Sequence, residues 1–358
     1  MNLDYSDEQI LLRESADAFL RGTAIPEWSQ LAELGWLGLP LPEEHGGFGQ
    51  GAIDAGILTE AMGRHGARTP FVTNVALCGH LIAAIGNEAQ RAALLTSLIA
   101  GERKFALAHE ERGARGDLAF VETKATRRPE GWSLDGVKPI VADGGDADVF
   151  LITARTETGL GIFAIDRGMP GLSVEMKPAL DGGTLAAIAM SDMPVSAEAL
   201  LGDGRNCLTV LRRGIDLALS AWCFELVGLM ESILAATLDH TRTRQQFGRP
   251  LAANQVVRHR IADLSIAHEE ARALALRAAL MLDSGHSDAE AATAGAKARI
   301  GKLARHAAQD AIQLHGAMGV TDELPLGNRL KRILAIEPLF GSPSDQLRRH
   351  ASLRAEVF

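Results

Sequence analysis

Aromatic residues make up only 4% of this 358-residue chain, whereas hydrophobic residues make up 47% and charged residues 23%. The shortage of aromatics beside abundant Ala and Leu favours a mostly helical protein. Positive charge is also short, since the formal net charge is −9. Proteins that bind nucleic acid usually carry a basic patch, so the charge balance argues against nucleic acid as a partner.

Cysteine is scarce as well. Cys78, Cys207 and Cys223 have no metal-ligand spacing, so we expect three buried small hydrophobic residues and no metal site. The N-terminal stretch MNLDYSDEQI has neither the basic segment nor the apolar run of a secretory signal, and no apolar run reaches membrane length. These absences predict a soluble, cytoplasmic protein without a membrane span.

The chain is too long for one compact core, and its residue pattern changes twice. Residues 1–103 show helix-like apolar spacing that begins at a capping box of Ser6 and Gln9. Residues 104–204 hold short β-like runs separated by Gly, Asp and Pro, a pattern typical of a small antiparallel barrel or sandwich. Residues 205–358 return to the helical period. We therefore predict an N-terminal helical domain, a middle β domain and a C-terminal helical domain.

Each domain prediction rests on particular segments. Long helices with short links favour a C-terminal four-helix bundle over 206–244, 254–284, 288–316 and 328–356. Ser287 and Glu290 predict the N-terminal cap of the third of these helices. Helices are also expected over 52–63 and 73–100, and strands at 105–108, 119–126, 132–141, 149–154, 161–165, 172–176 and 185–191.

The helix end at 241–250, TRTRQQFGRP, has an unusual composition. Arg244 offers a planar set of donors that suits phosphate, Gln246 adds an amide donor, and Phe247 adds a flat apolar face. This set is suited to an anionic group joined to a ring, such as a dinucleotide. The alternative is a solvated helix end with ordinary surface charges.

A second helix end, DAIQLHGAMGV at 310–320, carries two glycines. Gly316 and Gly319 are either simple helix-terminating residues or positions that let a ligand approach the backbone. Gln313 lies about one turn before Gly316, so its amide would point at the same ligand in the second case.

Taken together, these motifs and the order helices, strands, helices resemble the acyl-CoA dehydrogenase family. GWLGLPLPEEHGGFG is similar to the family's first-domain signature, and LDGVKPIVADGGDADVFLITA to a divergent copy of its β-domain motif. LDHTRTRQQFGRPLAANQVVRHRIADL runs close to the family pattern throughout, so the resemblance covers nearly the whole chain. It implies FAD-dependent α,β-dehydrogenation of an acyl-CoA thioester, in which a carboxylate removes the α proton.

The resemblance also implies cofactor contacts. In the family, residues of these two helix ends contact the FAD of a neighbouring subunit. The matching positions in this chain are Arg244, Gln246, Phe247, Gln255, Gln313 and Gly316. The half of a flavin site that is lent to another subunit is therefore expected to be present.

The half that would face the chain's own flavin departs from the family pattern. The family motif T-E-P-x-A-G-S-D, aligned on Asp117, falls on EERGARGD at 110–117, so the threonine and serine donors are lost. Two acids and two arginines, including Arg112 and Arg115, stand there instead. The family's W-I-T falls on Ile140, Val141 and Ala142, which lose an indole and a hydroxyl.

The usual catalytic base is missing from both positions that the family uses. The residue before Gly341 is Phe340, and the alternative position, counted back from the arginine motif, is Ala218, with Leu219 where an arginine normally stands. Neither Phe340 nor Ala218 can accept a proton.

Two other carboxylates are candidates for the base. Glu225 follows Ala218 by two helical turns within the apolar stretch AWCFELVGLM, where it is either buried with a partner or exposed. It is the candidate relocated base. Glu337 is near the ordinary base in sequence, but Pro338 and the spacing count against it.

These departures leave three hypotheses. The first is a heterotetramer in which the chain lends FAD contacts to a related, catalytic subunit; the second is a self-sufficient homo-oligomer that uses Glu225; the third is a non-catalytic structural subunit. By resemblance, the electron acceptor is an electron-transfer flavoprotein and the pathway is β-oxidation of fatty acids or steroid side chains. The acyl group itself is not specified.

Overall fold

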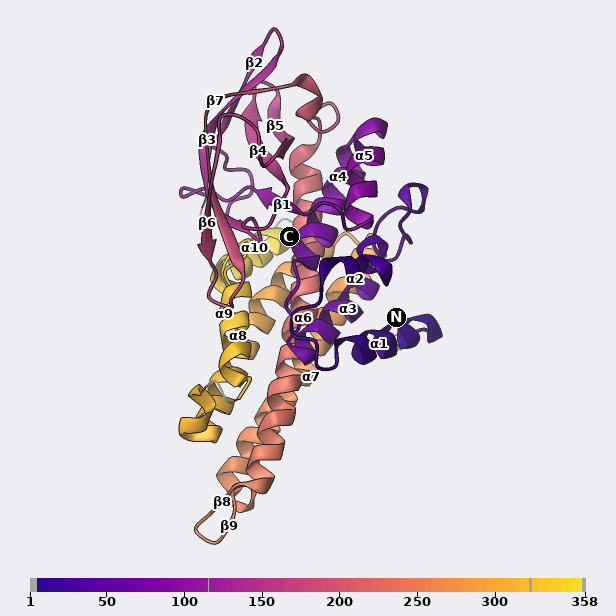
Figure 1. Cartoon of the computed structure of the whole chain (residues 1–358). Coiled ribbons are helices and arrows are strands. Elements are labelled where there is room, and N and C mark those ends of the chain that lie inside the picture. The colour runs from indigo at the N-terminus through magenta and orange to yellow at the C-terminus, as the bar shows by residue number, and fades with distance from the viewer. Residues whose placement is uncertain (1–4, 115, 322–323, 356–358) are drawn as a thin grey trace. The chain divides into compact units, whose positions relative to one another are not determined.

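The computed structural model describes residues 5–114, 116–321 and 324–355 (Figure 1). The chain forms two compact units, which are described separately below. The helical unit comprises Met1–Pro26, Gly51–Arg68 and Leu219–Phe358, and the sheet unit comprises Glu27–Gln50 and Thr69–Ala218. The predicted order of helical, β and helical regions along the chain is confirmed.

The helical unit is built from long and short α-helices. They are α1 (Asp7–Leu20), α3 (Ala52–His65), α6 (Cys207–Thr243) from Leu219 onward, α7 (Gln255–Asp283), α8 (Ala289–His315), α9 (Leu326–Ile336) and α10 (Pro343–Ala355). The predicted capping box of Ser6 and Gln9 opens α1. Helix α8 buries mostly alanines, which let α7 and α10 pack closely against it.

Helices α3 and α6 cross where two glycines remove side-chain bulk. A Cβ atom on Gly63 would lie 2.1 Å from the Glu225 carbonyl oxygen, and one on Gly228 would lie 1.9 Å from the Glu60 carbonyl oxygen. The crossing therefore requires glycine at both positions. One segment of α6 is also long and apolar enough to match a membrane span, but 78% of that segment is buried in the protein, as in a core helix.

Two sequence predictions for the helical unit are corrected by the structure. The expected helix over 328–356 is two helices, because α9 ends at Ile336 and Phe340 and Gly341 take left-handed conformations with φ values of 51° and 109°. The expected cap of α8 by Ser287 and Glu290 is absent: Asp288 occupies the cap position without a side-chain hydrogen bond. Glu290 instead accepts a hydrogen bond from Arg349 on α10, at 2.7 Å.

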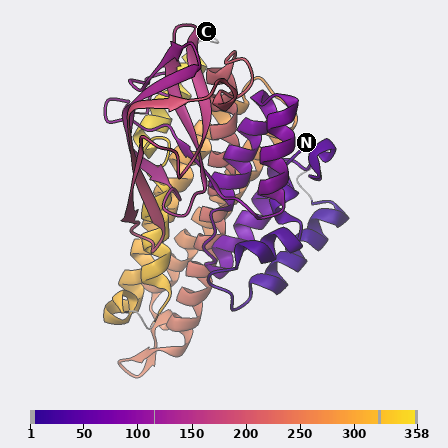
Figure 2. The same ribbon diagram turned by 45° about the horizontal axis from the view of Figure 1, so that its top comes forward.

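The sheet unit begins with short helices and continues as one seven-stranded sheet (Figure 2). The expected helix over 73–100 is divided into a π-helix (Val72–Gly79), α4 (His80–Ile85) and α5 (Glu88–Ile99), because Asn87 and Gln90 form a new capping box. The strands are β1 (Phe105–Ala108), β2 (Lys124–Arg128), β3 (Gly131–Ala142), β4 (Val149–Thr156), β5 (Gly159–Asp166), β6 (Leu172–Pro178) and β7 (Thr184–Val195).

The sheet is mixed, whereas the sequence predicted antiparallel pairing throughout. Four pairs are antiparallel, but β1 pairs with β4 in parallel, Phe105 opposite Val149, and β2 meets β4 in parallel at Lys124 and Arg155. The long connection between β1 and β4 makes a parallel pair possible. Strand β2 also starts at Lys124, later than predicted.

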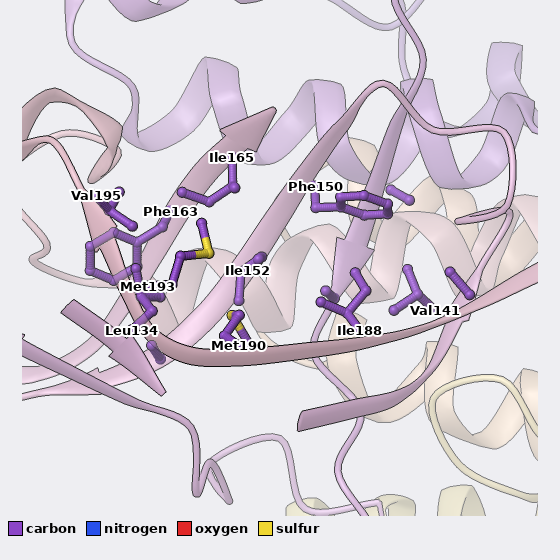
Figure 3. Close-up of a cluster of buried hydrophobic side chains, with 14 of the residues drawn as sticks. Leu134, Val141, Phe150, Ile152, Phe163, Ile165, Ile188, Met190, Met193 and Val195 are labelled. Atoms are coloured by element: carbon purple, nitrogen blue, oxygen red, sulfur yellow. The ribbon is translucent and has the colours of Figure 1, made fainter. Parts of the chain in front are cut away.

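A hydrophobic cluster fills the curled sheet (Figure 3). Its large members are Leu134, Val141, Phe150, Ile152, Phe163, Ile165, Ile188, Met190, Met193 and Val195. The first six residues of β4 are buried, as expected of a central strand with both faces covered. All three cysteines are buried free thiols, as predicted.

Candidate cofactor and catalytic site

The first motif lies on a short hairpin between α6 and α7, at the free end of these two helices (Figure 1). Strands β8 (Gln245–Gln246) and β9 (Arg249–Pro250) pair, and Phe247 and Gly248 form the turn, with φ values of 53° and 76°. Two left-handed residues are typical of a two-residue hairpin turn, but phenylalanine is unfavourable there, at a cost of about 1 kcal/mol. The Phe247 side chain is also 100% exposed. Packing within this chain therefore does not explain the choice of phenylalanine.

The polar residues of the first motif face solvent. Arg244 and Gln246 are exposed, and so is Gln255, the first residue of α7. The hairpin is fixed to α7 by Arg249, whose guanidinium donates to the side-chain oxygen of Asn254 at 2.7 Å. This bond ties the hairpin to the start of α7, and the Arg244 and Gln246 side chains remain exposed to another molecule.

The second motif ends α8. Gly316 has a φ of 63°, and a Cβ atom there would meet no atom within 4 Å. Its left-handed conformation therefore explains the glycine, which favours the helix-terminating role for this residue. Gly319 is different, because its Cβ would lie 2.7 Å from the Ile312 carbonyl oxygen. The Gln313 side chain is exposed one turn before the helix end.

The structure brings the ends of α6 and α8 together. The rings of His240, on the last turn of α6, and His315, the last residue of α8, stack with centroids 4.2 Å apart and an interplanar angle of 24°. The two motifs, distant in sequence, therefore occupy one end of the bundle. Their exposed arginine and glutamine side chains offer hydrogen-bond donors, and the exposed phenylalanine offers an apolar face; such a set would suit a dinucleotide.

The segment expected to face the chain's own flavin is only partly available for that role. Glu111 is buried, and its carboxylate accepts hydrogen bonds from Lys138 at 2.7 Å and from the Thr123 hydroxyl at 2.6 Å. Of the two acids in this segment, Glu111 points into the sheet unit, where Lys138 is its cation. Arg112 is exposed, and Arg115 lies outside the described residues.

Charge at this buried pair is set by opposing effects. Burial alone raises the pKa of Glu111, but hydrogen bonds from Lys138, Thr123 and the Glu122 amide hold it below its ordinary value. Burial lowers the pKa of Lys138 to about 8, against the opposing influence of Glu111. Lys138 also donates to the His109 carbonyl and to Thr153, so it is a structural cation inside the unit.

At the positions of the family's W-I-T, the chain presents only apolar side chains. Ile140 is exposed and Val141 is buried, as alternation along β3 requires. With Ala142 next to them, no side-chain donor stands at these three positions. The chain's own half of a flavin site therefore fits FAD less well than the half displayed on the bundle end.

The two usual base positions hold no proton acceptor. Phe340 is buried, and its ring stacks on Trp222 with centroids 6.0 Å apart. Lys297 donates to the carbonyl oxygens of Ile336 and Glu337, shortly before Phe340 in the chain, at 3.0 and 2.9 Å. Burial lowers the pKa of Lys297 to about 8. Ala218 is buried on α6.

Glu225 is buried with a partner, the first of the two possibilities that the sequence left open. Its oxygens accept hydrogen bonds from Nε and Nη2 of Arg332, on α9, at 2.6 and 2.9 Å. A proton taken up by Glu225 would compete with this bidentate ion pair, so the geometry favours a structural role. Its role as a relocated base stays a prediction. Glu337, the other carboxylate considered, is paired with Arg305.

Sequence reasoning did not identify Arg332, Trp222 or Lys138. Arg332 lies 107 positions from Glu225, so no local spacing connects the two. The one available signal was the lone carboxylate in an apolar helix, which requires a cation somewhere in the fold.

The helical, curled-sheet and helical architecture is that of a flavin-dependent dehydrogenase, and the bundle end carries exposed side chains that would suit a dinucleotide. Three domain models of one family match in succession: the acyl-CoA dehydrogenase N-terminal domain over residues 6–102, the middle domain over 106–193 and the C-terminal domain over 209–351. The chain belongs to the acyl-CoA dehydrogenase family, which consists of oxidoreductases with FAD as cofactor.

Individual relatives agree with this assignment. Mitochondrial isovaleryl-CoA dehydrogenase of Pongo abelii is 28% identical over 96% of this chain and 87% of its own length. The solved FAD complex of PigA superposes with a TM-score of 0.93 and 26% identity over 99% of both chains. The steroid acyl-CoA dehydrogenase Tcur3481–Tcur3483 superposes with a TM-score of 0.88 and 29% identity over 98% of both chains.

Proposed function

We propose that this chain is the FAD-contacting subunit of a hetero-oligomeric acyl-CoA dehydrogenase, whose related partner subunit supplies the base. The observation that carries the proposal is Phe247, an entirely exposed phenylalanine in a left-handed turn, beside exposed Arg244 and Gln246. Phe247 is not packed against the described part of its own chain, and the group suits a ring and phosphates held by a neighbouring subunit.

The absence of a proton acceptor supports the division of labour. A base must approach the α carbon of the thioester, and the two usual positions hold buried Phe340 and Ala218. The chain's own flavin-facing positions, Ile140–Ala142, lack hydroxyl and indole donors. A partner subunit that keeps these groups would supply the flavin-facing half of the site. This chain would supply the contacts on the end of its bundle. Tcur3481–Tcur3483, named for two proteins, supports the plausibility of such a pair.

In the proposed complex, the residues of this chain bind and orient. The Arg244 guanidinium neutralises and hydrogen-bonds phosphate oxygens, the amides of Gln246, Gln255 and Gln313 add donors, and the Phe247 ring covers a flat apolar face. Hydride acceptance is the chemistry that FAD supplies when bound. The substrate is an acyl-CoA thioester of the fatty-acid or steroid side-chain class, the acceptor is an electron-transfer flavoprotein, and the complex is cytoplasmic.

The test is the amount of flavin per chain. The full chain is purified alone and co-purified with the related acyl-CoA dehydrogenase encoded nearest to it, and flavin absorbance is measured in both. We expect no flavin alone and about half a flavin per chain in the complex, since only mixed interfaces would be complete. One flavin per chain alone, with turnover of acyl-CoA, contradicts the proposal and favours the homo-oligomer with Glu225 as base.

Variants of the hairpin sharpen this test. Phe247→Ala should weaken FAD retention by the complex about tenfold or more, because stacking of a base on an aromatic ring is worth about 1–3 kcal/mol. Leu347→Ala is the matched control, since Leu347 is an exposed apolar residue on α10. Equal flavin content in both variants would show that the hairpin does not contact the cofactor. A complex with stoichiometric flavin and no dehydrogenase activity would favour a structural subunit.

A further inference from the structure

Two histidines join the helix ends that carry the dinucleotide motifs. His240 lies on the last turn of α6, just before Arg244, which follows the helix end. His315 is the last residue of α8 and lies between Gln313 and Gly316. Their rings stack at 4.2 Å. His315 is buried, and its Nδ1 lies 2.8 Å from the Ala311 carbonyl oxygen, so Nδ1 carries a hydrogen and the ring orientation is set. The stack is a direct side-chain link between the two motifs.

The charge state of this link depends on pH. Burial lowers the pKa of His240, the neighbouring His315 and Arg244 lower it further, and Asp239 opposes them. The protonated form of His240 is therefore disfavoured beside the His315 ring, whose centroid lies 4.2 Å away. Asp310, the last acidic residue within α8, lies 3.6 Å from His306.

We propose that the His240–His315 stack is a positioning pair that holds the Arg244 end of α6 against the Gln313 end of α8, and that protonation of His240 weakens it. The inference rests on the proposed function, because one dinucleotide that contacts both motifs needs them at one spacing. Because the pKa of His240 lies below the ordinary histidine value, we expect the stack at neutral pH and its loss as the pH falls through the pKa of His240. Binding of the dinucleotide phosphates to this chain is therefore acid-sensitive.

The first experiment needs no flavin. Imidazole resonances of the full-length chain are titrated by NMR in the wild type, in His315→Gln and in the control His306→Gln, which alters an exposed histidine of the same helix. His315 is one of the groups that lower the pKa of His240, so His240 should titrate at higher pH in His315→Gln and unchanged in the control. An unchanged His240 titration in His315→Gln overturns the positioning pair.

The second experiment measures FAD affinity of the co-purified complex at about pH 8 and about pH 5.5, on either side of the histidine range. Loss of an aromatic pair should weaken FAD binding by His315→Gln about three- to tenfold at the higher pH. Acidification should weaken the wild type and the His306→Gln control, with little further effect on His315→Gln. Equal pH slopes in all three overturn the inference.

The two readouts separate this inference from the proposed function. A wild-type complex without FAD at either pH overturns the proposed function, while the NMR titration still decides whether the rings are coupled. Coupled rings together with pH-independent FAD binding overturn the positioning role alone.

Discussion

Replacing Glu225 by glutamine distinguishes a structural carboxylate from a catalytic one. The substitution keeps the shape of the side chain and removes its charge, which leaves Arg332 without its bidentate partner. Removing one member of a buried ion pair costs about 3–5 kcal/mol. The Arg332 side chain is 18% exposed and glutamine keeps one acceptor oxygen, so we expect a loss of about 2–3 kcal/mol in the free energy of unfolding.

The assay is equilibrium unfolding in urea of Glu225→Gln, Arg332→Gln and the double variant. If the pair is structural, each single variant loses a similar amount and the double variant loses little more than either, because both changes remove the same ion pair. Turnover is measured on the same samples. A Glu225→Gln variant whose free energy of unfolding lies within about 0.5 kcal/mol of the wild-type value would refute our reasoning. Abolished turnover at that stability would identify Glu225 as the base.

Three further predictions concern stability. Lys138→Met leaves the Glu111 charge buried without a cation and should cost about 3–5 kcal/mol in urea unfolding, most of it recovered when Glu111→Gln is added. Burial lowers the pKa of His109 to about 4, so the unfolded chain binds this proton more readily. Stability should fall by about 3 kcal/mol as the pH drops from 6.5 to about 4, and the fall should be smaller in His109→Gln. Gly228→Ala should cost about 3 kcal/mol at the helix crossing, whereas Gly327→Ala, in open space on α9, should change Tm little or raise it.

Features that depend on neighbouring residues could be predicted from the sequence. The order of the three regions follows from apolar periods of helix and strand, and the Ser6–Gln9 cap follows from a three-residue spacing. Strands β3 to β7 were predicted within a few residues because Gly, Asp and Pro turns bound them. The candidate cofactor contacts were predicted from short motifs, because residue type alone determines which side chains can donate hydrogen bonds.

Features that depend on partners far along the chain were decided by tertiary structure. The sequence shows that Glu225 needs a cation, but only the packing of α9 identifies it as Arg332. The sequence alignment predicts Glu111 in a flavin-facing segment, and only the fold shows that Lys138 pairs with it. Apolar periodicity records that one face of a segment is buried and leaves open which segment covers it. The meeting of His240 with His315 is therefore visible only in the folded chain, where α6 and α8 end side by side.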